Sequence, residues 1–417
     1  MKPSKQAVGR FFISQYNCTY WRIVMKTVED AITFIHSRPK GGQKESLHRM
    51  FTLLNALDNP QEQLPPAIHV TGTNGKGSVS TMASNILRVA GYRTGLFISP
   101  YIVNFRERIQ INNQWIAEQD LLAVAQLVEK KLITVDQQLA PDVPTEFEVL
   151  TAIMMTYFAR ENLDALVIEV GIGGQLDSTN VMPNATVAVI TSVGLDHQAL
   201  LGDTIAAIAE QKAGIIHDNM AVVIGELPEA AQWVIEKRSK RPIIHGHSGQ
   251  FEQGLPGQYQ VQNTATAVAA VNAFDESITV EQIQNGLKQS QFAARFETIR
   301  PGIIIDGAHN YQGLMQLVTA LNTGEYEKQT KTLIIGSLMD KNVVLAFSDI
   351  LTQAKFDIVL VPFTGPNGRH SLNISSVAKQ YAIKTADSWQ TAFHESHSDM
   401  TIFTGSLYFV SEVRNQL

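Results

Sequence analysis

The stretch His69-Val70-Thr71-Gly72-Thr73-Asn74-Gly75-Lys76-Gly77-Ser78 decides how the chain folds. An apolar run at 67–70 precedes it and predicts a buried strand, while the apolar residues of 79–92 have helical spacing. A strand, a glycine-rich turn and a helix form the setting of a phosphate-binding loop, in which backbone N–H groups and the helix N-terminus face phosphate oxygens. We therefore expect a nucleoside triphosphate site, with Lys76 reaching the outer phosphates and Ser78 offering a hydroxyl to a magnesium ion.

The stretch departs from the usual phosphate-loop pattern at one position. A serine or threonine is expected directly after Gly75-Lys76, but Gly77 comes before Ser78. The alternative is an ordinary glycine turn between a strand and a helix. Three glycines, a lysine and a hydroxyl in this setting favour the nucleotide site.

Composition narrows the class of protein. With 417 residues, 44% hydrophobic and 17% charged, the chain predicts two or three globular domains. Its net charge of −6 argues against a broad nucleic-acid surface, so no nucleic-acid partner is expected. No apolar run reaches the roughly 18 residues of a membrane span. Cys18 is the only cysteine, which excludes a disulfide within the chain and a cysteine-rich metal site and suits the reducing cytoplasm.

The first residues have a distinct charge pattern. Residues 1–28 carry five lysines or arginines and no acidic residue, which suits either a targeting segment or a basic surface tail. They lack the apolar core and the small-residue cleavage site of a secretory signal. We expect residues 1–26 to be an extension, and residues 1–24, upstream of a natural start at Met25, to be dispensable.

Apolar runs alternate with helical segments along the whole chain, which predicts an α/β fold with mostly parallel sheets covered on both faces. The pattern restarts near 290–297, so we expect an ATP-binding domain at 1–291 and a smaller Rossmann-like domain at 292–417. The expected strands are 67–70, 94–99, 165–170, 185–193, 221–225, 242–246, 302–306, 331–336, 356–361 and 400–404. The expected helices are 28–36, 47–57, 118–132, 146–160, 203–214, 228–238, 263–274, 280–288, 311–321, 342–353, 374–381 and 388–396, with 118–132 and 146–160 interpreted as charged, solvated helices.

Polar residues follow several of the expected strands. Glu169 ends one strand, at the position where a phosphate-loop enzyme holds magnesium. His197 follows the next strand; alone it would be a structural histidine, but beside Glu169 a metal role is favoured, and its softer nitrogen suggests a second metal position. Asp306-Gly-Ala-His-Asn310 follows the first strand of the second unit, where it either contacts a ligand or forms an Asp/Asn turn. Lys212 has helical neighbours and, by itself, indicates a surface charge.

Together these motifs resemble the folylpolyglutamate synthase and dihydrofolate synthase family, within the Mur-type ligases, from about residue 28 to the C-terminus. Each motif alone is weak, whereas the ordered set is highly specific. The matching segments are His69-Val-Thr-Gly-Thr-Asn-Gly-Lys-Gly-Ser78, Ser99-Pro100, Phe105-Arg-Glu-Arg-Ile109, Thr145-Glu-Phe-Glu148, Glu169-Val-Gly-Ile-Gly-Gly174, Asp177-Ser-Thr-Asn180, Gly194-Leu-Asp-His197, Lys212-Ala-Gly-Ile215, Asp306-Gly-Ala-His-Asn310 and Thr404-Gly-Ser-Leu-Tyr408.

The resemblance implies a role for individual positions. It implies a phosphate-loop domain followed by a Rossmann-like domain, with ATP and Mg²⁺ bound between them. Lys212 matches the family lysine that is carbamylated, and His309 lies in the second-domain motif with a less definite catalytic role. The implied ATP-binding residues are Gly75, Lys76, Gly77, Ser78, Asn263, Arg295 and Asp306, and the implied metal ligands are Ser99, Glu169 and His197.

The implied activity is that of an ATP-dependent ligase. It adds L-glutamate to the γ-carboxylate of a folyl-polyglutamate through an acyl phosphate, releasing ADP and phosphate. Dihydrofolate synthesis from dihydropteroate and L-glutamate is the alternative, alone or in addition, and a nucleotide-gated folate-binding protein is the non-enzymatic one. Glu169, His197 and Lys212 argue against the binding protein. We expect a monomer in the cytoplasm, with neither nucleic acid nor membrane as partner.

Four features depart from the family pattern. Tyr101 stands where many members have histidine, Gln175 replaces a frequent arginine, and Tyr311 stands where proline is common. The loop at 247–260 is also short. The first two positions bear on the pterin and glutamate contacts, whereas the short loop is peripheral to ATP and metal.

Overall fold

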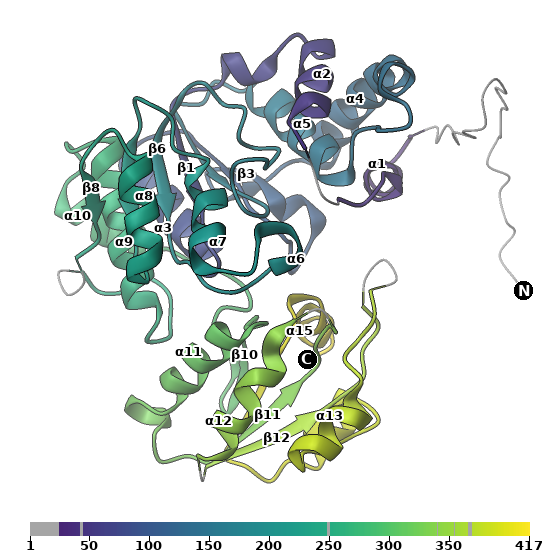
Figure 1. Ribbon diagram of the computed structural model, residues 1–417, viewed down its shortest axis with the longest axis vertical. Helices are drawn as coiled ribbons and strands as arrows, with labels where there is room; N and C mark the ends of the chain where they lie inside the picture. The colour runs from purple at the N-terminus through teal and green to yellow at the C-terminus, as the bar shows by residue number, and fades with distance from the viewer. Residues whose placement is uncertain (1–24, 42–44, 248–250, 340, 354, 366–368) are drawn as a thin grey trace, which may run out of the picture.

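The computed structural model describes residues 25–41, 45–247, 251–339, 341–353, 355–365 and 369–417. Most of the expected extension, 1–24, lies outside these residues. Figure 1 shows two lobes, with α1 to α10 in one and α11 to α15 in the other. Within the described residues, the first lobe is built on an eight-stranded sheet and the second on a six-stranded sheet. The predicted α/β fold class is confirmed.

The first sheet is mostly parallel and has the strand order β4-β3-β2-β5-β1-β6-β7-β8. Only its edge strands β3 and β4 pair antiparallel, within the described residues. At the sheet centre, Val70 of β1 is level with Glu169 of β5, so the carboxyl ends of these strands meet at one edge. The strands are β1 (Ala67–Thr71), β2 (Thr94–Phe97), β3 (Ile109–Ile111), β4 (Gln114–Trp115), β5 (Ala165–Glu169), β6 (Ala185–Ile190), β7 (Ala221–Ile224) and β8 (Ile243–His245).

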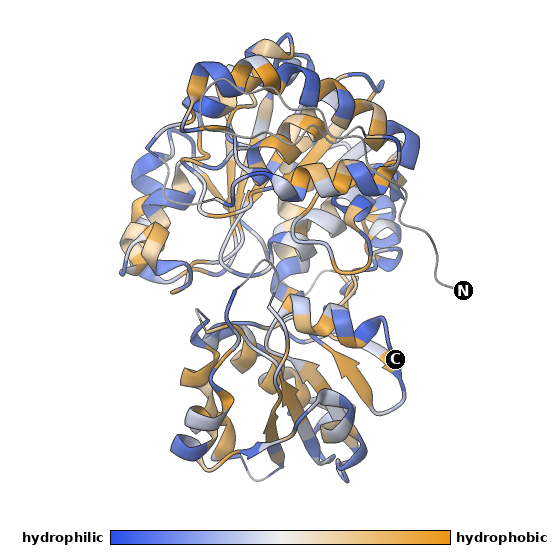
Figure 2. Cartoon of the chain, turned by 90° about the vertical axis from the view of Figure 1, so that its right-hand side faces the viewer, coloured by the Kyte–Doolittle hydropathy of each residue, from blue (hydrophilic) through white to orange (hydrophobic). Residues whose placement is uncertain are grey.

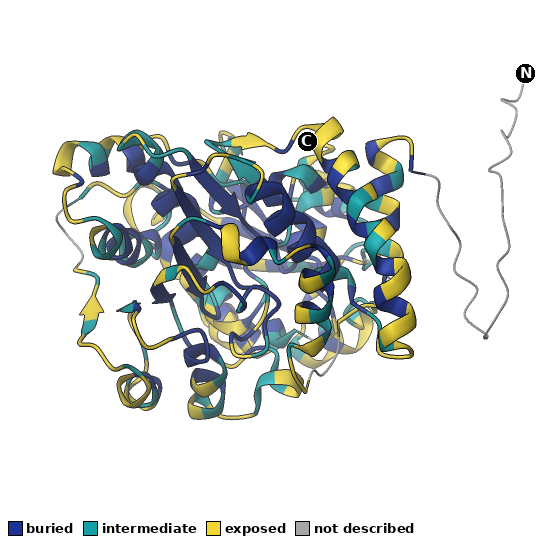
Figure 3. Ribbon diagram, turned by 90° about the horizontal axis from the view of Figure 1, so that it is seen from above, coloured by how far each residue is buried: buried dark blue, intermediate teal, exposed yellow. Residues whose placement is uncertain are grey.

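The central strands are mostly apolar because helices cover both faces of the sheet. Along β5, Leu166 and Ile168 pack into one core and Ala165 and Val167 into another. Figure 2 shows these strands in orange, and Figure 3 shows them as buried. The helices of this lobe are α1 (Val28–Ser37), α2 (His48–Ala56), η1 (Pro60–Gln63), α3 (Lys76–Val89), η2 (Phe105–Arg108), α4 (Glu118–Leu139), α5 (Glu146–Phe158), α6 (Gln198–Leu201), α7 (Ile205–Ala213), α8 (Glu229–Arg238), α9 (Gln260–Phe274) and α10 (Val280–Lys288).

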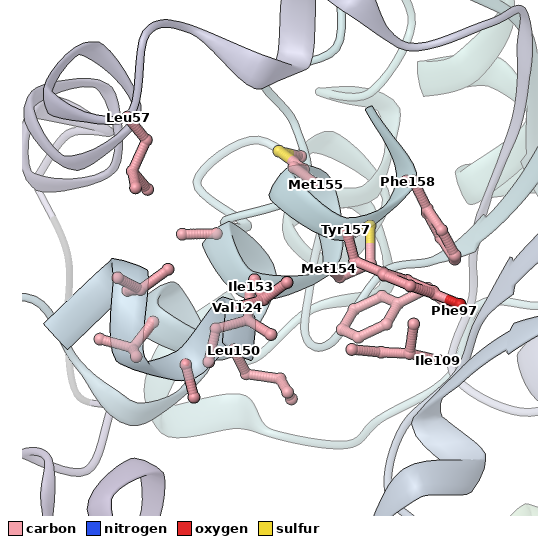
Figure 4. Packing of buried hydrophobic residues seen from close by; sticks show 14 of the residues in the cluster. Leu57, Phe97, Ile109, Val124, Leu150, Ile153, Met154, Met155, Tyr157 and Phe158 are labelled. Carbon is pink, nitrogen blue, oxygen red and sulfur yellow. The ribbon is translucent and has the colours of Figure 1, made fainter. Parts of the chain in front are cut away.

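The expectation of a solvated helix at 146–160 was wrong. In α5 every residue from Glu148 to Phe158 is buried, and Figure 4 shows Leu150, Met154 and Phe158 packed among side chains from other elements. The acidic residues that suggested a solvated surface lie in the first turn, where Thr145 and Glu148 form a capping box. The helix packs against α4, α1 and α2, so it is a central element of its lobe.

The second sheet has the strand order β13-β12-β11-β14-β10-β9, and β9 pairs antiparallel at one edge. A single helix was expected over 342–353, but the chain forms a 3-10 turn followed by one short α-helix. The strands are β9 (Glu297–Arg300), β10 (Ile303–Ile305), β11 (Lys331–Ile335), β12 (Phe356–Leu360), β13 (Lys384–Thr385) and β14 (Met400–Thr404). The helices are α11 (Tyr311–Leu321), η3 (Gly324–Tyr326), η4 (Asn342–Ala346), α12 (Phe347–Leu351), α13 (Ile374–Tyr381), α14 (Trp389–His394) and α15 (Leu407–Arg414).

Candidate functional site

The glycine-rich turn joins β1 directly to α3, which begins at Lys76 and not at residue 79 as expected. Gly75 has φ 85°, a left-handed conformation that favours glycine, and a side chain there would collide with the Asn263 amide. A Cβ at Gly77 would lie 2.5 Å from the Phe292 ring. Close packing against Phe292 therefore explains the glycine that interrupts the usual phosphate-loop pattern.

The polar side chains of this turn are held in place by their neighbours. Lys76 Nζ donates to the carbonyl oxygens of Gly72, at 2.9 Å, and Thr73, at 3.3 Å. Ser78 is 2% exposed, and its Oγ accepts from Gln260 Nε2 at 3.2 Å. Burial lowers the pKa of Lys76, with the carboxylates of Glu169 and Asp196 opposing the shift. An ammonium group partly stripped of water interacts more strongly with a phosphate anion.

Glu169 lies beside this turn at the carboxyl end of β5. Its side chain is 3% exposed, and Oε2 accepts from the backbone N–H of Ser99 at 2.9 Å. Burial raises the pKa of Glu169, while the charge of Lys76 and the Ser99 hydrogen bond oppose that rise. A buried carboxylate beside a phosphate loop is a suitable partner for a hard cation.

The donors at this edge fit a magnesium ion that arrives with a triphosphate. Among the residues that the structure describes, no group of three or more His, Cys, Asp or Glu side chains is arranged to hold a metal. Mg²⁺ is usually held by one or two carboxylates together with phosphate oxygens and water, so Glu169 and the hydroxyls of Ser78 and Ser99 match that need. His197 directly precedes α6 as its N-cap residue, and its Nε2 is 3.5 Å from Lys341 Nζ.

Lys212 is buried, contrary to what its helical neighbours alone indicated. It lies in the last turn of α7, is 2% exposed, and lines the same cleft as the phosphate loop. Within the described part of the chain no carboxylate forms an ion pair with it. Burial lowers the pKa of this amine well below its ordinary value, and the nearby Lys76 charge adds to the effect. The environment therefore favours an uncharged, nucleophilic amine.

The second lobe presents the loop after β10 to the first lobe. The Asp306 carboxylate accepts from Tyr259 Oη at 2.7 Å, from the Phe296 N–H at 2.8 Å and from the Ala308 N–H at 2.8 Å, so it organises this loop. His309 Nδ1 donates to the Gly307 carbonyl at 2.9 Å. This bond fixes the position of the imidazole at the boundary between the lobes.

Polar contacts between the lobes involve residues outside the expected site set, of which Asp196, Asn310 and Asn74 lay in quoted segments and Lys341 was missed. Lys341 Nζ is 2.9 Å from Asp196 Oδ1, and Asn310 Nδ2 lies 3.1 Å from Asn74 Oδ1 and 3.3 Å from Asp196 Oδ2. Asp196 stands inside the segment that was quoted for His197, so a signal for it existed. Lys341 has no local signal, because only the docking of the two lobes brings it to Asp196.

All the expected site residues line one cleft of about 1060 Å³ between the lobes. Their roles stay predictions, but their positions converge. The cleft includes Gly75, Lys76, Gly77, Ser78, Ser99, Glu169, His197, Lys212, Asn263, Arg295, Asp306 and His309. Phosphate-binding groups, a buried carboxylate and a buried amine from one lobe thus face polar groups from the other.

Comparison with known proteins agrees with this arrangement. The Mur ligase middle domain family matches residues 70–242. The chain is 38% identical to a folylpolyglutamate synthase of Lacticaseibacillus casei, covering 93% of this chain and 98% of that protein. It is 31% identical to a dihydrofolate synthase/folylpolyglutamate synthase of Bacillus subtilis, covering 93% of this chain and 99% of that protein.

Solved structures extend the agreement to the fold. An FPGS–AMPPCP–folate complex superposes with a TM-score of 0.82 at 35% identity, over 94% of this chain and 99% of that one. Mycobacterium tuberculosis folylpolyglutamate synthase complexed with ADP and AMPPCP gives 0.82 at 27% identity, over 93% of this chain and 98% of that one. The chain therefore belongs to the folylpolyglutamate synthase and dihydrofolate synthase family of ATP-dependent acid–amino acid ligases.

Proposed function

We propose that this chain joins L-glutamate to the γ-carboxylate of a reduced folate or folyl-polyglutamate, with ATP as cosubstrate. The observation that carries the proposal is the single cleft in which Lys76, Glu169, Lys212 and the Asp306–Asn310 loop meet. A carboxylate must approach a triphosphate in this reaction, so cationic groups at the meeting point are required.

The reaction proceeds in two steps. A γ-carboxylate oxygen attacks the terminal phosphorus of ATP, which forms the acyl phosphate and releases ADP. The amine of L-glutamate then attacks the acyl carbon, loses a proton, and the tetrahedral intermediate expels phosphate to leave an amide. Lys76 and the N–H groups of the glycine-rich turn hold the phosphates, while Asn263 and Arg295 contact the nucleotide from beside the second lobe. A bound Mg²⁺, held through Ser99, Glu169 and His197, would neutralise negative charge on the phosphates.

Closure of the two lobes protects the acyl phosphate, which would hydrolyse in open water. Asp306 and His309 belong to the second-lobe wall of the cleft. In this proposal Asp306 shapes the loop that approaches the nucleotide, and His309 orients the incoming amine. The domain limits we propose are 1–291 and 292–417, with 1–26 as an extension.

Lys212 is proposed to be carbamylated. Its uncharged amine nitrogen attacks carbon dioxide and loses a proton to solvent, which converts a neutral amine into a carboxylate-like anion. The low pKa of the buried amine supplies the uncharged nucleophile that this step requires. Mass spectrometry of the native protein and incorporation of ¹³C-labelled carbon dioxide would detect the modification.

Dihydrofolate synthesis is the second candidate activity, because relatives such as the Bacillus subtilis protein are named for both activities. The decisive experiment measures glutamate-dependent ADP formation with tetrahydrofolate and with dihydropteroate. Activity with tetrahydrofolate supports the leading proposal, and activity with dihydropteroate supports the second. If neither acceptor supports glutamate-dependent ADP formation, both proposals are wrong, and nucleotide binding without turnover would leave a nucleotide-gated binding protein. We also propose that the protein acts as a cytoplasmic monomer; in the described residues no helix is both long and apolar enough to span a lipid bilayer.

A further inference from the structure

Arg108 is a buried cation that forms no side-chain hydrogen bond or ion pair with the residues that the structure describes, although the more distant charges of Glu146 and Glu169 act on it. It ends η2, lines the cleft between the lobes, and is 7% exposed. Its Nε is buried and has no hydrogen-bond partner, and no carboxylate among the described residues forms an ion pair with its guanidinium. The contact that the structure gives the guanidinium is the Phe105 ring, whose centroid is 5.5 Å from Cζ. A ring face cannot satisfy the donors of an arginine.

Other arginines of the chain show that this arrangement is unusual. Arg38, also 7% exposed, donates to both carboxylate oxygens of Asp136, at 2.7 and 2.8 Å. Arg106 lies two residues before Arg108 and pairs with Glu118 at 3.2 Å. Burying a guanidinium without a paired anion lowers the stability of the folded protein. Such a group is therefore expected where it serves the function of the site. The missing anion is therefore expected to come with a ligand.

The position of Arg108 indicates which ligand this is. A guanidinium fork matches a carboxylate or a phosphate through two parallel hydrogen bonds. The glycine-rich turn with Lys76 already provides a phosphate site at the end of β1. Arg108 is carried by a different segment, beyond β2, and it lines the cleft together with Ser99, Thr145 and Phe147. This wall suits the organic acceptor more than the triphosphate.

The acceptor of the proposed reaction ends in a glutamate with two carboxylates. One of them is phosphorylated, and the other must be neutralised while it lies near the anionic phosphates and Glu169. We propose that Arg108 binds the α-carboxylate of this terminal glutamate and thereby leaves the γ-carboxylate to react. The assignment rests on the proposed function, since it specifies how that function selects its acceptor and its site of extension.

Dihydropteroate makes the assignment testable, because it ends in a single aryl carboxylate. When that carboxylate reacts, no second carboxylate remains for Arg108. Arg108 should therefore support the extension of glutamate-terminated folates and contribute little to dihydrofolate synthesis. It would act as a determinant of acceptor class and of γ-linkage within one cleft.

The experiment compares the wild type and Arg108→Gln on three acceptors: tetrahydrofolate, its α-amide and dihydropteroate. Arg108→Gln should lower kcat/KM for tetrahydrofolate about 100-fold, the range of a lost charged hydrogen bond. Replacing the acceptor's α-carboxylate by an amide should cost wild-type enzyme a similar factor and Arg108→Gln nothing further. Arg106→Gln is the matched control; it removes a cation from the same helix and should behave as wild type. The KM values for ATP and L-glutamate should stay within about two-fold.

Several outcomes would overturn the assignment. These are equal losses with tetrahydrofolate and dihydropteroate, a rise confined to the KM for L-glutamate, or wild-type enzyme that accepts the α-amide as readily as the acid. Should Arg108→Gln not fold, Arg108→Lys, which keeps the charge without the fork, and the α-amide on wild-type enzyme still give the answer. If the wild type is inactive with both tetrahydrofolate and dihydropteroate, the proposed function itself is wrong. An unchanged Arg108→Gln enzyme beside an active wild type would defeat the Arg108 assignment alone.

Discussion

Lys341 Nζ lies 2.9 Å from Asp196 Oδ1, and this ion pair joins the second lobe to the first. The Lys341 and Asp196 side chains are 8% and 11% exposed, so water screens their attraction weakly. Burial alone would raise the pKa of Asp196, but contact with His309 and the charge of Lys341 outweigh it and hold that pKa well below its usual range. Asp196 is thus the anion on which the second lobe docks.

Asp196→Asn should weaken this docking. It would leave Lys341 buried without a counter-charge, a change that costs far more than the loss of an exposed pair. We expect kcat/KM to fall about 30-fold or more, the effect of losing a charged contact of about 2 kcal/mol. ATP should still bind within about three-fold of the wild-type Kd, because the phosphate loop belongs to the first lobe.

The control for this variant is Asp357→Asn, which removes the exposed partner of Lys384 in the second lobe, where the side chains are 59% and 72% exposed. Such a pair contributes at most about 1 kcal/mol, so activity should not change. Small-angle scattering with bound nucleotide would report whether the Asp196 variant adopts a more open shape. An Asp196→Asn enzyme as active and as compact as the wild type would contradict the docking role.

Lys76→Ala should remove most nucleotide affinity. The Lys76 ammonium is held over the loop by the Gly72 and Thr73 carbonyls, so it is preorganised for phosphate. A rise in the Kd for ATP of about 100-fold is expected, as for the loss of a charged hydrogen bond. Isothermal titration calorimetry measures this directly. Lys237→Ala, at a lysine that stacks on the exposed Trp233, is the matched control and should bind ATP normally.

Sequence predicted most of the elements whose signals are local. The glycine-rich turn lies between a strand and a helix as expected, and Glu169 ends its strand as expected, because strand ends are set by short-range patterns. Even there the helix begins at Lys76, three residues early, because close packing at Gly77 is not visible in the residue pattern.

Features fixed by tertiary packing were missed. The hairpin of β3 and β4 is too short and polar to predict, although Asn112 and Asn113 both have the positive φ of a tight turn. Lys212 resembled a surface lysine because helical spacing cannot show that neighbouring elements cover a residue. The acidic residues in the first turn of 146–158 similarly suggested a solvated helix, although the helix is buried. In each case long-range contacts override the local preference.

Lys212→Ala should separate binding from turnover. ATP should bind with an unchanged Kd, whereas turnover should fall by more than about 100-fold, the usual range for removing a group that stabilises charge in the transition state. If a carbamate is the functional form, added short carboxylates should restore part of the activity, and removal of carbon dioxide should reduce wild-type turnover reversibly. Lys240→Ala, which alters an exposed pair with Asp218, provides the control. Unchanged turnover in Lys212→Ala would exclude this lysine from the mechanism.

His69 should make the stability of the first lobe depend on pH. It lies in β1, is 1% exposed, and donates from Nε2 to Thr179 Oγ1 at 2.8 Å, since that hydroxyl itself donates to Asp177 Oδ1 at 2.6 Å. Burial, with a smaller effect from the charge of His217, lowers the pKa of His69 from 6.5 to about 3. His69 therefore takes up a proton near pH 6.5 in the unfolded chain, but only near pH 3 in the folded chain.

The free energy of unfolding therefore falls as the pH is lowered. The contribution of neutral His69 is complete above pH 6.5 and is lost as the pH falls towards about 3. The slope is about 1.4 kcal/mol per pH unit, so about 2 kcal/mol should disappear between pH 6.5 and about pH 5. Urea unfolding of the wild type and of His69→Gln at about pH 7.5 and about pH 5 measures it. His69→Gln should be less stable at the higher pH yet lose about 2 kcal/mol less on acidification. Parallel losses in both proteins would mean that another group carries the pH dependence, and His245→Gln, at an exposed histidine of β8, should retain the full wild-type slope.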